Sequence, residues 1–286
     1  MKFGYLIYTE FESKRNVFFI DRLISACKNK GLKLILLLSE KINFLIDNNE
    51  KKIIYDNDIL DLPDFVIQRT MNFNLSFLFE SLGVKVFNSS YIGLVADNKY
   101  LSYVKMHSIN IPILKTILSK KIEIDNLFFP NVTKPINSKG GDRVYLNKNI
   151  NEYNESIKNY DEDFLIQEPS EIIGKDLRVY VIGKNIIASM LRTSNTGLIS
   201  NFTKGGSARQ YKLDNDEEKI VKKIINEFDF DYVGIDFLLN KKGLVFNEIE
   251  NVVGARMLYE YTEIDIAEIF IDYIYNYINN NNKYNI

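Results

Sequence analysis

Three acidic residues in the last quarter of the chain have the type and spacing of a magnesium site: Asp236, Glu248 and Glu250. They lie in two segments, residues 233–239 and 244–250, whose β-branched and aromatic side chains predict two strands. Like charges about 4 Å apart repel by roughly 1 kcal/mol in water and about 4 kcal/mol at an effective dielectric constant near 20, so gathered carboxylates favour a bound cation. Oxygen ligands alone favour Mg²⁺ or Mn²⁺, and Mg²⁺ usually binds together with substrate phosphates.

The turn between the two strands decides whether the acids meet. We expect a three-residue loop over residues 241–243, in which Gly243 takes the left-handed backbone conformation. Residues 240 and 244 then pair, and Asp236 lies directly opposite Glu248. A slip of one residue would separate the two carboxylates.

Alternation along the strands predicts which side chains face the core. Glu250 shares the face of Glu248, whereas the opposite face carries Ile235, Phe237, Leu239, Val245 and Ile249. The hairpin alone leaves a second interpretation open, in which three solvated acids line an exposed strand face.

The composition restricts the chemistry further. The chain of 286 residues is 46% hydrophobic and 13% aromatic, enough for two or three compact units. One cysteine, Cys27, argues against disulfides and cysteine-cluster zinc sites and suits the cytoplasm. One histidine, His107, in a run typical of a helix surface, argues against a Ser-His-Asp triad or a multi-histidine metal site. Any catalysis must therefore use carboxylates, Lys, Arg and the backbone.

Charge and hydropathy argue against nucleic acid and membranes as partners. The net charge of −2 gives no basic surface for nucleic acid. We also see neither a signal peptide nor an apolar run long enough to span a membrane. We therefore expect no nucleic-acid and no membrane partner, while the Phe and Tyr content leaves room for a homo-oligomer face.

The first 88 residues predict a small α/β domain with a parallel sheet. A strand over residues 2–8 and a polar loop over 9–15 precede an amphipathic helix with Ile20, Leu23, Ile24 and Cys27 facing inward. A strand over 34–38 completes a βαβ unit. Two further strands, 65–68 and 84–87, flank a helix over 75–82. Because the glycine pattern Gly-x-Gly-x-x-Gly is missing, this is not a dinucleotide-binding unit.

A lysine and a glycine-rich turn mark the middle of the chain. Lys134 lies on a predicted strand, residues 131–135, and the turn over 138–143 leads into a strand over 144–146. Lys134 and the backbone N–H groups of Gly140 and Gly141 could cover the phosphates of a nucleotide. An ordinary hairpin with a Gly-Gly turn is the alternative.

Further polar signals follow along the chain. Glu168-Pro169 closes a predicted strand over residues 165–167, residues 174–178 precede a strand over 179–182, and Arg192 ends the next strand.

Taken in this order with the three acids, the chain resembles the ATP-grasp superfamily and, within it, the RimK-like carboxylate-amine ligases. The residues that carry the resemblance are Gln68-Arg69, Asn88, Asp97 to Lys99, Ile111-Pro112, Lys134-Pro135, Gln167-Glu168, Gly174 to Arg178, Arg192, Ser200-Asn201, Gly205-Gly206, residues 233–237, Glu248 and Gly254.

The resemblance covers nearly the whole chain and implies its organisation. Residues 1–88 are similar to the α/β pre-ATP-grasp domain, which helps to shape the acceptor site. Residues 89–286 are similar to the two-lobed α+β ATP-grasp domain, with a small lobe over about 100–166 and a large lobe over about 167–286.

The resemblance also implies site residues. Lys99 and Lys134 would contact the ATP phosphates, the Glu168-Pro169 backbone the adenine, and Asp176 the ribose or another part of the nucleotide. Arg178 and Arg192 would face the transferred phosphate, and Asp236, Glu248 and Glu250 would hold two Mg²⁺. The full set implied to bind the nucleotide is Lys99, Lys134, Gly140, Gly141, Gln167, Glu168, Pro169, Asp176 and Asn201.

The implied reaction is the ATP-dependent joining of a carboxylate to an amine through an acyl phosphate, with release of ADP and phosphate. The cofactors would be ATP with Mg²⁺, or Mn²⁺ in its place, and the partners a small-molecule or peptide carboxylate and an amine. Two alternatives stay open: a non-catalytic ATP-binding regulatory module, and a kinase-like ATP-grasp enzyme.

Three departures from the family pattern bear on the substrate. Glu250 stands where Asn is usual, and Asn251 would take that role if the strand bulges. Asp142-Arg143 replaces a glycine of the phosphate-covering loop. Residues 252–257 lack the Ser-Pro-Gly of many relatives, which suggests Arg256 as a ligand for a substrate carboxylate.

Overall fold

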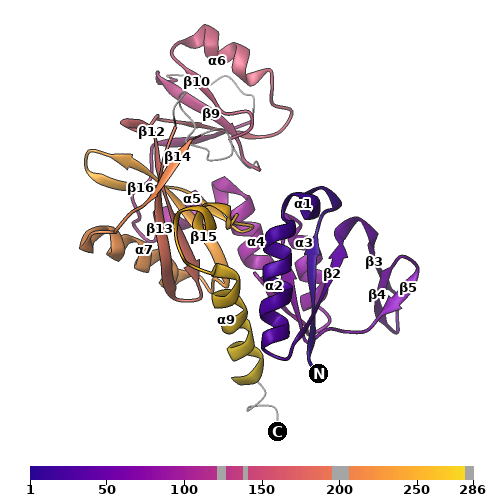
Figure 1. Cartoon of the computed structure of the whole chain (residues 1–286). Helices are drawn as coiled ribbons and strands as arrows, with labels where there is room; N and C mark the ends of the chain where they lie inside the picture. Colours follow the sequence, from indigo (N-terminus) through magenta and orange to yellow (C-terminus); the bar gives the residue numbers. More distant parts are fainter. Residues whose placement is uncertain (121–126, 138–140, 195–205, 281–286) are drawn as a thin grey trace. The chain divides into compact units, whose positions relative to one another are not determined.

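The computed structural model describes residues 1–120, 127–137, 141–194 and 206–280, and its elements are labelled in Figure 1. The chain forms two compact units. Unit 1 comprises Met1–Leu94, Asp229–Val233 and Asn251–Ile286, and unit 2 comprises Val95–Phe228 and Gly234–Glu250. Within the described ranges, no helix is long and apolar enough to cross a membrane.

Unit 1 is built on the parallel sheet that the sequence predicts. Its strand order is β2-β1-β6-β7, and every neighbouring pair is parallel. Apolar residues fill these strands because both faces of a parallel sheet are covered. The strands are β1 (Phe3–Tyr8), β2 (Lys33–Leu38), β6 (Phe65–Gln68) and β7 (Lys85–Phe87).

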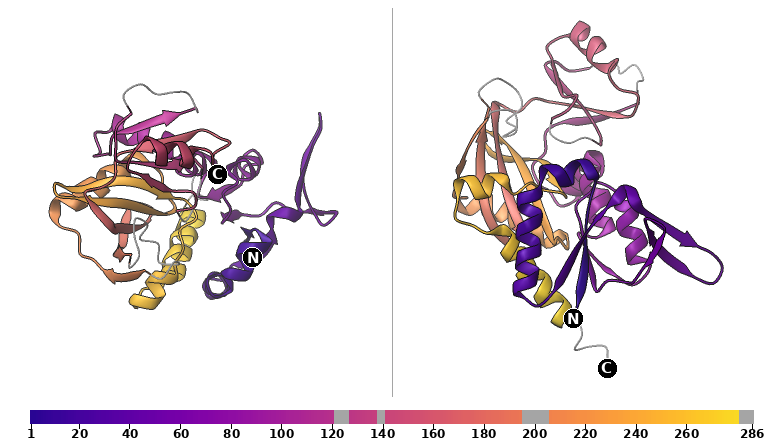
Figure 2. Two further views of the ribbon diagram at one scale, coloured as in Figure 1. Left: turned by 90° about the horizontal axis from the view of Figure 1, so that it is seen from above. Right: turned by 45° about the vertical axis from the view of Figure 1, so that its right-hand side comes forward.

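The helix α2 (Val17–Asn29) buries one apolar face, which includes Ile20, Leu23 and Cys27 as predicted. The C-terminal helix α9 (Ile266–Asn280) packs against α2, and the two lie side by side in Figures 1 and 2. Burial raises the pKa of the Cys27 thiol to about 12, so Cys27 is an unreactive core residue.

The predicted polar loop over residues 9–15 is wrong, because Glu10–Arg15 forms the short helix α1. The Thr9 side chain accepts a hydrogen bond from the Glu12 backbone N–H and caps the helix. The sequence signals were present, since acidic residues open this segment and Lys14 and Arg15 close it, as the helix dipole favours.

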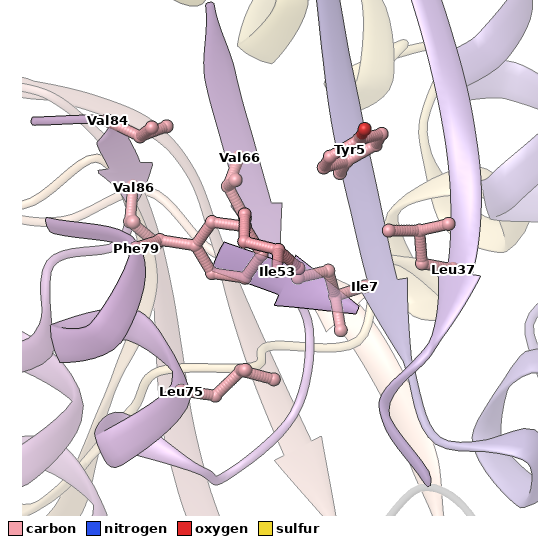
Figure 3. Close-up of a cluster of buried hydrophobic side chains, with 9 residues drawn as sticks. All are labelled: Tyr5, Ile7, Leu37, Ile53, Val66, Leu75, Phe79, Val84 and Val86. Carbon is pink, nitrogen blue, oxygen red and sulfur yellow. The ribbon is translucent and has the colours of Figure 1, made fainter. Parts of the chain in front are cut away.

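An apolar cluster fills unit 1 between the sheet and α3 (Phe73–Glu80). Figure 3 shows its buried members: Tyr5, Ile7, Leu37, Ile53, Val66, Leu75, Phe79, Val84 and Val86. Ile53 comes from a three-stranded antiparallel sheet that the sequence did not predict, formed by β3 (Ile42–Ile46), β4 (Lys51–Tyr55) and β5 (Asp58–Leu60).

The described part of unit 2 forms two antiparallel sheets. The four-stranded sheet has the order β10-β9-β11-β8, and the predicted lysine-bearing hairpin is its β9–β10 pair. Its elements are β8 (Thr116–Ser119), β9 (Asn131–Pro135), β10 (Tyr145–Asn147) and β11 (Phe164–Gln167), with helix α6 (Ile150–Ile157) contacting β9 and β10.

The five-stranded sheet carries the arginines and acids. Its order is β14-β13-β12-β15-β16, from β12 (Ile172–Ile182), β13 (Asn185–Thr193), β14 (Ser207–Gln210), β15 (Tyr232–Asn240) and β16 (Gly243–Glu250). Residues 174–178 lie inside β12, so the prediction that they precede the strand was wrong.

The remaining helices are η1 (Ser39–Lys41), α4 (Ser90–Asp97), α5 (Lys99–Ser108), α7 (Asn215–Glu227) and α8 (Arg256–Tyr261). His107 is exposed on α5, as predicted from its helix-surface pattern. By its contacts, unit 1 also includes residues 229–233 and 251–286, and the predicted domain boundary at residue 88 stays a prediction.

Candidate functional site

The β15–β16 hairpin pairs Asp236 directly with Glu248, as the sequence predicts. The loop that joins the two strands, however, differs from the predicted one. Asn240 pairs with Gly243, so the loop has two residues, and the extra residue sits in a β-bulge between Asp236 and Phe237. The predicted three-residue loop is therefore wrong, and the bulge restores the register that the shorter loop shifts.

The bulge also changes which side chains share a face. Phe246 pairs with Phe237 on the core face, and Val245 pairs with Leu238. Val245 therefore faces the same way as Leu238 and Asp236, which corrects the prediction that it joins Phe237. Val245 is nevertheless buried, so this part of the hairpin has apolar contacts on both faces.

Two arginines hold the Asp236 carboxylate. Arg178, from β12, donates from Nε and Nη2 to its two oxygens at 2.8 and 2.7 Å. Arg192, from β13, donates from Nη2 to Oδ2 at 2.6 Å. Arg178 also forms an ion pair with Glu250. The geometry is a two-arginine clamp on a carboxylate that is fully buried.

Asp176 extends this network on the β12 side. Its two carboxylate oxygens accept hydrogen bonds from Arg192 Nε and Nη2, at 2.5 and 2.9 Å. Burial would raise the pKa of Asp236, but Arg178 and Arg192 lower that pKa to about 2. Burial raises the pKa of Asp176 to about 6 in spite of Arg192. Both carboxylates are therefore ionised at neutral pH.

The three acids have the donor chemistry of a magnesium site, because all are carboxylates on paired strands of one hairpin. In the part of the chain that the structure describes, however, no group of three or more acidic, His or Cys side chains is arranged to hold a metal ion. Asp236 and Glu250 contact arginine and Glu248 contacts lysine. These side chains would have to turn for a cation to be held, so the metal assignment stays a prediction.

Two lysines lie beside the bulge of β16. Lys99 opens α5 behind the capping residue Asn98, and its Nζ lies 3.4 Å from Glu248 Oε2. Lys134, on β9, donates from Nζ to the Tyr103 hydroxyl at 3.0 Å and to Asn247 Oδ1 at 3.2 Å. Burial lowers the pKa of Lys134 to about 8, although the Glu248 charge opposes the shift.

Tyr103 and Asn247 are site residues that the sequence analysis missed. Asn247 is the unpaired residue of the bulge, and a one-residue excess between two strands was the only signal that could have drawn attention to it. Tyr103 lies one helical turn after Lys99 on α5, a spacing that places two side chains on one helix face.

The predicted adenine-binding segment lies at the end of β11. Gln167 is buried and donates from Nε2 to Thr116 Oγ1 at 2.8 Å. The Glu168 backbone N–H donates to the Lys115 carbonyl at 3.0 Å, and Pro169 follows. Their contact with adenine stays a prediction.

Some predicted residues lie away from the arginines and acids, and others lie outside the residues that the structure describes. Gly140 and Asn201 lie outside the described residues, as do Ser200 and Gly205, whereas Gly141 has the left-handed φ of 67°. Asn251 accepts a hydrogen bond from Asn88 Nδ2 on its Oδ1 at 2.9 Å, within unit 1. The bulge falls at Asn247, so it does not bring Asn251 into the place of residue 250. Arg256 is exposed at the start of α8.

A family model described as a RimK-like ATP-grasp domain matches residues 92–274. The chain belongs to this family. It is an ATP-dependent carboxylate-amine ligase that forms a carbon-nitrogen bond, and such ligases use ATP with Mg²⁺.

Relatives of known name match most of this RimK-like ligase. A "Probable alpha-L-glutamate ligase" of Maridesulfovibrio salexigens is 27% identical over 96% of this chain and 95% of its own length. The "Tetrahydromethanopterin:alpha-L-glutamate ligase" of Methanocaldococcus jannaschii is 26% identical over 81% of this chain and 86% of its own.

Solved structures share the fold. D-alanyl-alanine synthetase A of Vibrio cholerae has a TM-score of 0.75 at 12% identity and covers 97% of this chain and 98% of its own. A RimK domain ATP-grasp protein of Sphaerobacter thermophilus has a TM-score of 0.72 at 17% identity, covering 96% of this chain and 99% of its own. The predicted combination of a parallel α/β domain and an ATP-grasp domain is confirmed.

Proposed function

We propose that this ligase joins the amino group of L-glutamate, or of a similar amino acid, to a substrate carboxylate through an acyl phosphate. Two relatives that match 96% and 81% of the chain are both named "Probable alpha-L-glutamate ligase", which supports glutamate as the amine. The reducing conditions that suit a single buried cysteine support the cytoplasm as the place of reaction.

In the first step, a carboxylate oxygen forms a bond to the γ-phosphorus of ATP and the bond to the β-phosphate oxygen breaks, so that ADP leaves. We assign the contacts to the phosphates to Lys99 and Lys134 and the developing charge on the transferred group to Arg178 and Arg192. Bound Mg²⁺ would supply further neutralisation of the phosphate charge, with Asp236, Glu248 and Glu250 as its ligands and Mn²⁺ as a substitute.

In the second step, the amine nitrogen forms a bond to the acyl carbon and phosphate leaves with the electrons of the broken carbon-oxygen bond. The nitrogen loses its proton to solvent. Neither step needs a histidine, which agrees with the exposed position of His107. The chain contributes mainly positioning and fixed charge.

The observation that carries the proposal is the pair of arginines on Asp236, of which Arg192 is buried and Arg178 nearly so. Arg178 and Arg192 come from neighbouring strands and converge on one carboxylate, so two cationic groups are already gathered where negative charge would develop. Clustering cations in a buried position is costly unless anions neutralise them. Substrate phosphates would do so once the acids bind metal ions.

The test is ADP release with ATP, Mg²⁺, L-glutamate and pools of carboxylic acids and short peptides, followed by mass spectrometry of the pools that respond. We expect ADP only when an acid and glutamate are both present, together with an amide product. ADP formed with the acid alone would favour a kinase-like reaction, and tight ATP binding without turnover in any pool would favour a regulatory module. The same assay with the other amino acids checks the preference for glutamate.

We also propose that Arg256 binds a carboxylate of the substrate, because it is an exposed guanidinium just after the acid-bearing hairpin. Arg256→Ala should raise the KM for one substrate at least about fivefold, the range of one charge-assisted contact, with kcat little changed. An unchanged KM for both substrates would remove Arg256 from the site.

A further inference from the structure

The two lysines beside the bulge have partners of different charge. Lys99 forms an ion pair with the Glu248 carboxylate. Lys134 has two neutral partners, the Tyr103 hydroxyl and the Asn247 side-chain carbonyl oxygen. The negative charge of Glu248 also acts on Lys134, but its ion-pair contact goes to Lys99. The positive charge of Lys134 is therefore retained, whereas that of Lys99 is offset.

The bulge explains how consecutive residues of β16 serve both lysines. In a regular strand, the side chains of Asn247 and Glu248 would point to opposite faces. The bulge between Asp236 and Phe237 interrupts that alternation, and Asn247 Oδ1 reaches Lys134 while Glu248 Oε2 reaches Lys99. The Lys99 backbone N–H also donates to the Ile136 carbonyl just after β9, which ties the two lysine-bearing segments together.

Tyr103 fixes Lys134 from the helix side. Its side chain is buried, and its ring packs edge-on against Phe246 with centroids 5.7 Å apart. Burial raises the pKa of Tyr103, so the hydroxyl stays neutral and accepts the Lys134 hydrogen bond without cancelling its charge. Lys99 and Tyr103 share one face of α5, so the same helix supplies one lysine and holds the other.

An ammonium group has three donors, and these two contacts use two of them. A third donor is left for an oxygen outside the described chain. Burying a charged group without a full ionic partner costs free energy, which an anionic ligand would offset.

We propose that Tyr103 and Asn247 are positioning residues that hold Lys134 by neutral contacts, so that its whole positive charge and its third donor serve the nucleotide phosphates. The proposal rests on the use of ATP by this ligase, and it does not depend on which acid or amine is joined. Asn247 acts through Lys134 and therefore determines nucleotide affinity more than the rate of bond formation.

The test introduces a charged partner of the same shape. Asn247→Asp should weaken ADP binding, measured by calorimetry without metal, at least about tenfold, because an ion pair with Lys134 would offset its charge. In steady-state assays the KM for ATP should rise while kcat stays within about threefold. Asn43→Asp, on an exposed strand position of β3, is the matched control and should bind ADP as the parent does.

A double-mutant cycle separates the proposal from a general loss of structure. In a Lys134→Met background, Asn247→Asp should have no further effect on ADP binding beyond about twofold, since the lysine it neutralises is gone. Tyr103→Phe, which removes only the hydroxyl, should weaken ADP binding about threefold to tenfold in the parent and not in Lys134→Met.

A second variant avoids the new charge. Deleting Asn247 removes the bulge while leaving the pairs Asp236–Glu248 and Phe237–Phe246 available. The deletion should retain the parent's circular dichroism spectrum and lose ADP affinity. Unchanged ADP binding by Asn247→Asp, or an equal loss in both lysine backgrounds, would overturn the proposal. Because ADP binding needs no acid or amine, a failure to find an amide product would leave this result intact.

Discussion

Asp236 is the residue on which most of the site's polar contacts converge. It is opposite Glu248 across the hairpin and is held by Arg178 and Arg192. Removing its charge would leave the buried Arg192 and the largely buried Arg178 with less compensation and would remove one proposed metal ligand. Asp236 therefore neutralises the two arginines when no ligand is bound, and it is proposed to bind a metal ion during the reaction.

We expect Asp236→Asn and Glu248→Gln each to lower the rate of amide formation about tenfold to a thousandfold, the range found when a key electrostatic group is removed. The measurement is kcat by ADP release at saturating ATP and Mg²⁺. Asp21→Asn, at an exposed position of α2, is the control for an acid-to-amide change. Near-normal turnover in both site variants would remove these acids from the metal site.

The lowered pKa of Lys134 leads us to expect that nucleotide binding depends on pH. Its pKa of about 8 means that it is charged below pH 8 and becomes neutral as the pH rises past that value. ADP affinity should therefore fall between about pH 8 and pH 9.5, and binding near pH 8 should take up protons. Calorimetry in two buffers of different ionisation enthalpy measures both effects. Lys134→Arg should remove the decline, because arginine stays charged over this range; a decline that persists in this variant would assign it to another group.

At the residue scale, charge type and spacing pointed to the acids and Lys134, and the family resemblance pointed to the arginines; their roles in the site stay predictions. The partners of Lys134 were not predictable in the same way. Tyr103 reads as one more aromatic residue on a helix, and Asn247 reads as a polar residue in a strand. Only the three-dimensional positions of β9, α5 and β16 within unit 2 give these two side chains a role.

At the scale of elements, the base of the acid-bearing hairpin is fastened by one side chain. Asn88 accepts hydrogen bonds on Oδ1 from the backbone N–H groups of Asp231 and Tyr232, at 2.8 and 2.9 Å. Its Nδ2 donates to the Tyr232 carbonyl at 2.7 Å and to Asn251 Oδ1 at 2.9 Å. The residue entering β15 and the residue leaving β16 are therefore held by the same amide.

Asn88→Ala should lower the free energy of unfolding by about 2–4 kcal/mol, because it leaves buried backbone groups without partners. Urea denaturation measures the change as a lower midpoint at an unchanged slope. Asn43→Ala, which truncates an exposed asparagine, should lower the free energy of unfolding by less than about 0.5 kcal/mol and leave the midpoint nearly unchanged. Equal midpoints for the two variants would contradict the anchoring role of Asn88.

The hairpin shows that its strands and register can be predicted from the sequence, whereas the position of its extra residue cannot. The strands and the Asp236–Glu248 register were predicted correctly because the apolar pattern and the two acids constrain both ends. The extra residue can be placed in the loop or in a bulge without changing that pairing. The choice of a bulge is consistent with the contacts that Asn247 makes, which no local pattern reveals.

At the scale of the whole molecule, unit 1 is assembled from three separate stretches of chain. The sequence predicted its sheet from the first 88 residues but not that α9 packs against α2, because a C-terminal amphipathic helix can cover many surfaces. Cys27 lies on the buried face of α2, so its thiol can serve as a probe of that face.

A chain ending before α9 should therefore expose Cys27. We expect the thiol of the full chain to resist a disulfide reagent under native conditions, since it is fully buried with a pKa raised to about 12. A chain ending at Ile264 should react at least about tenfold faster, measured by the absorbance of the released thiolate. The unfolded full chain gives the upper limit of the rate, and equal slow rates for both chains would show that α9 does not protect this face.

The contact between α2 and α9 also has a consequence for biosynthesis. The ribosome completes α2 early, whereas the helix that covers it emerges only after the two sheets of unit 2 have been translated. At roughly 5–20 residues per second, the apolar face of α2 waits on the order of ten to fifty seconds for its partner. The nascent N-terminal segment is then a candidate client for chaperones that bind apolar helices, while unit 2, whose residues end at Glu250, can fold ahead of it.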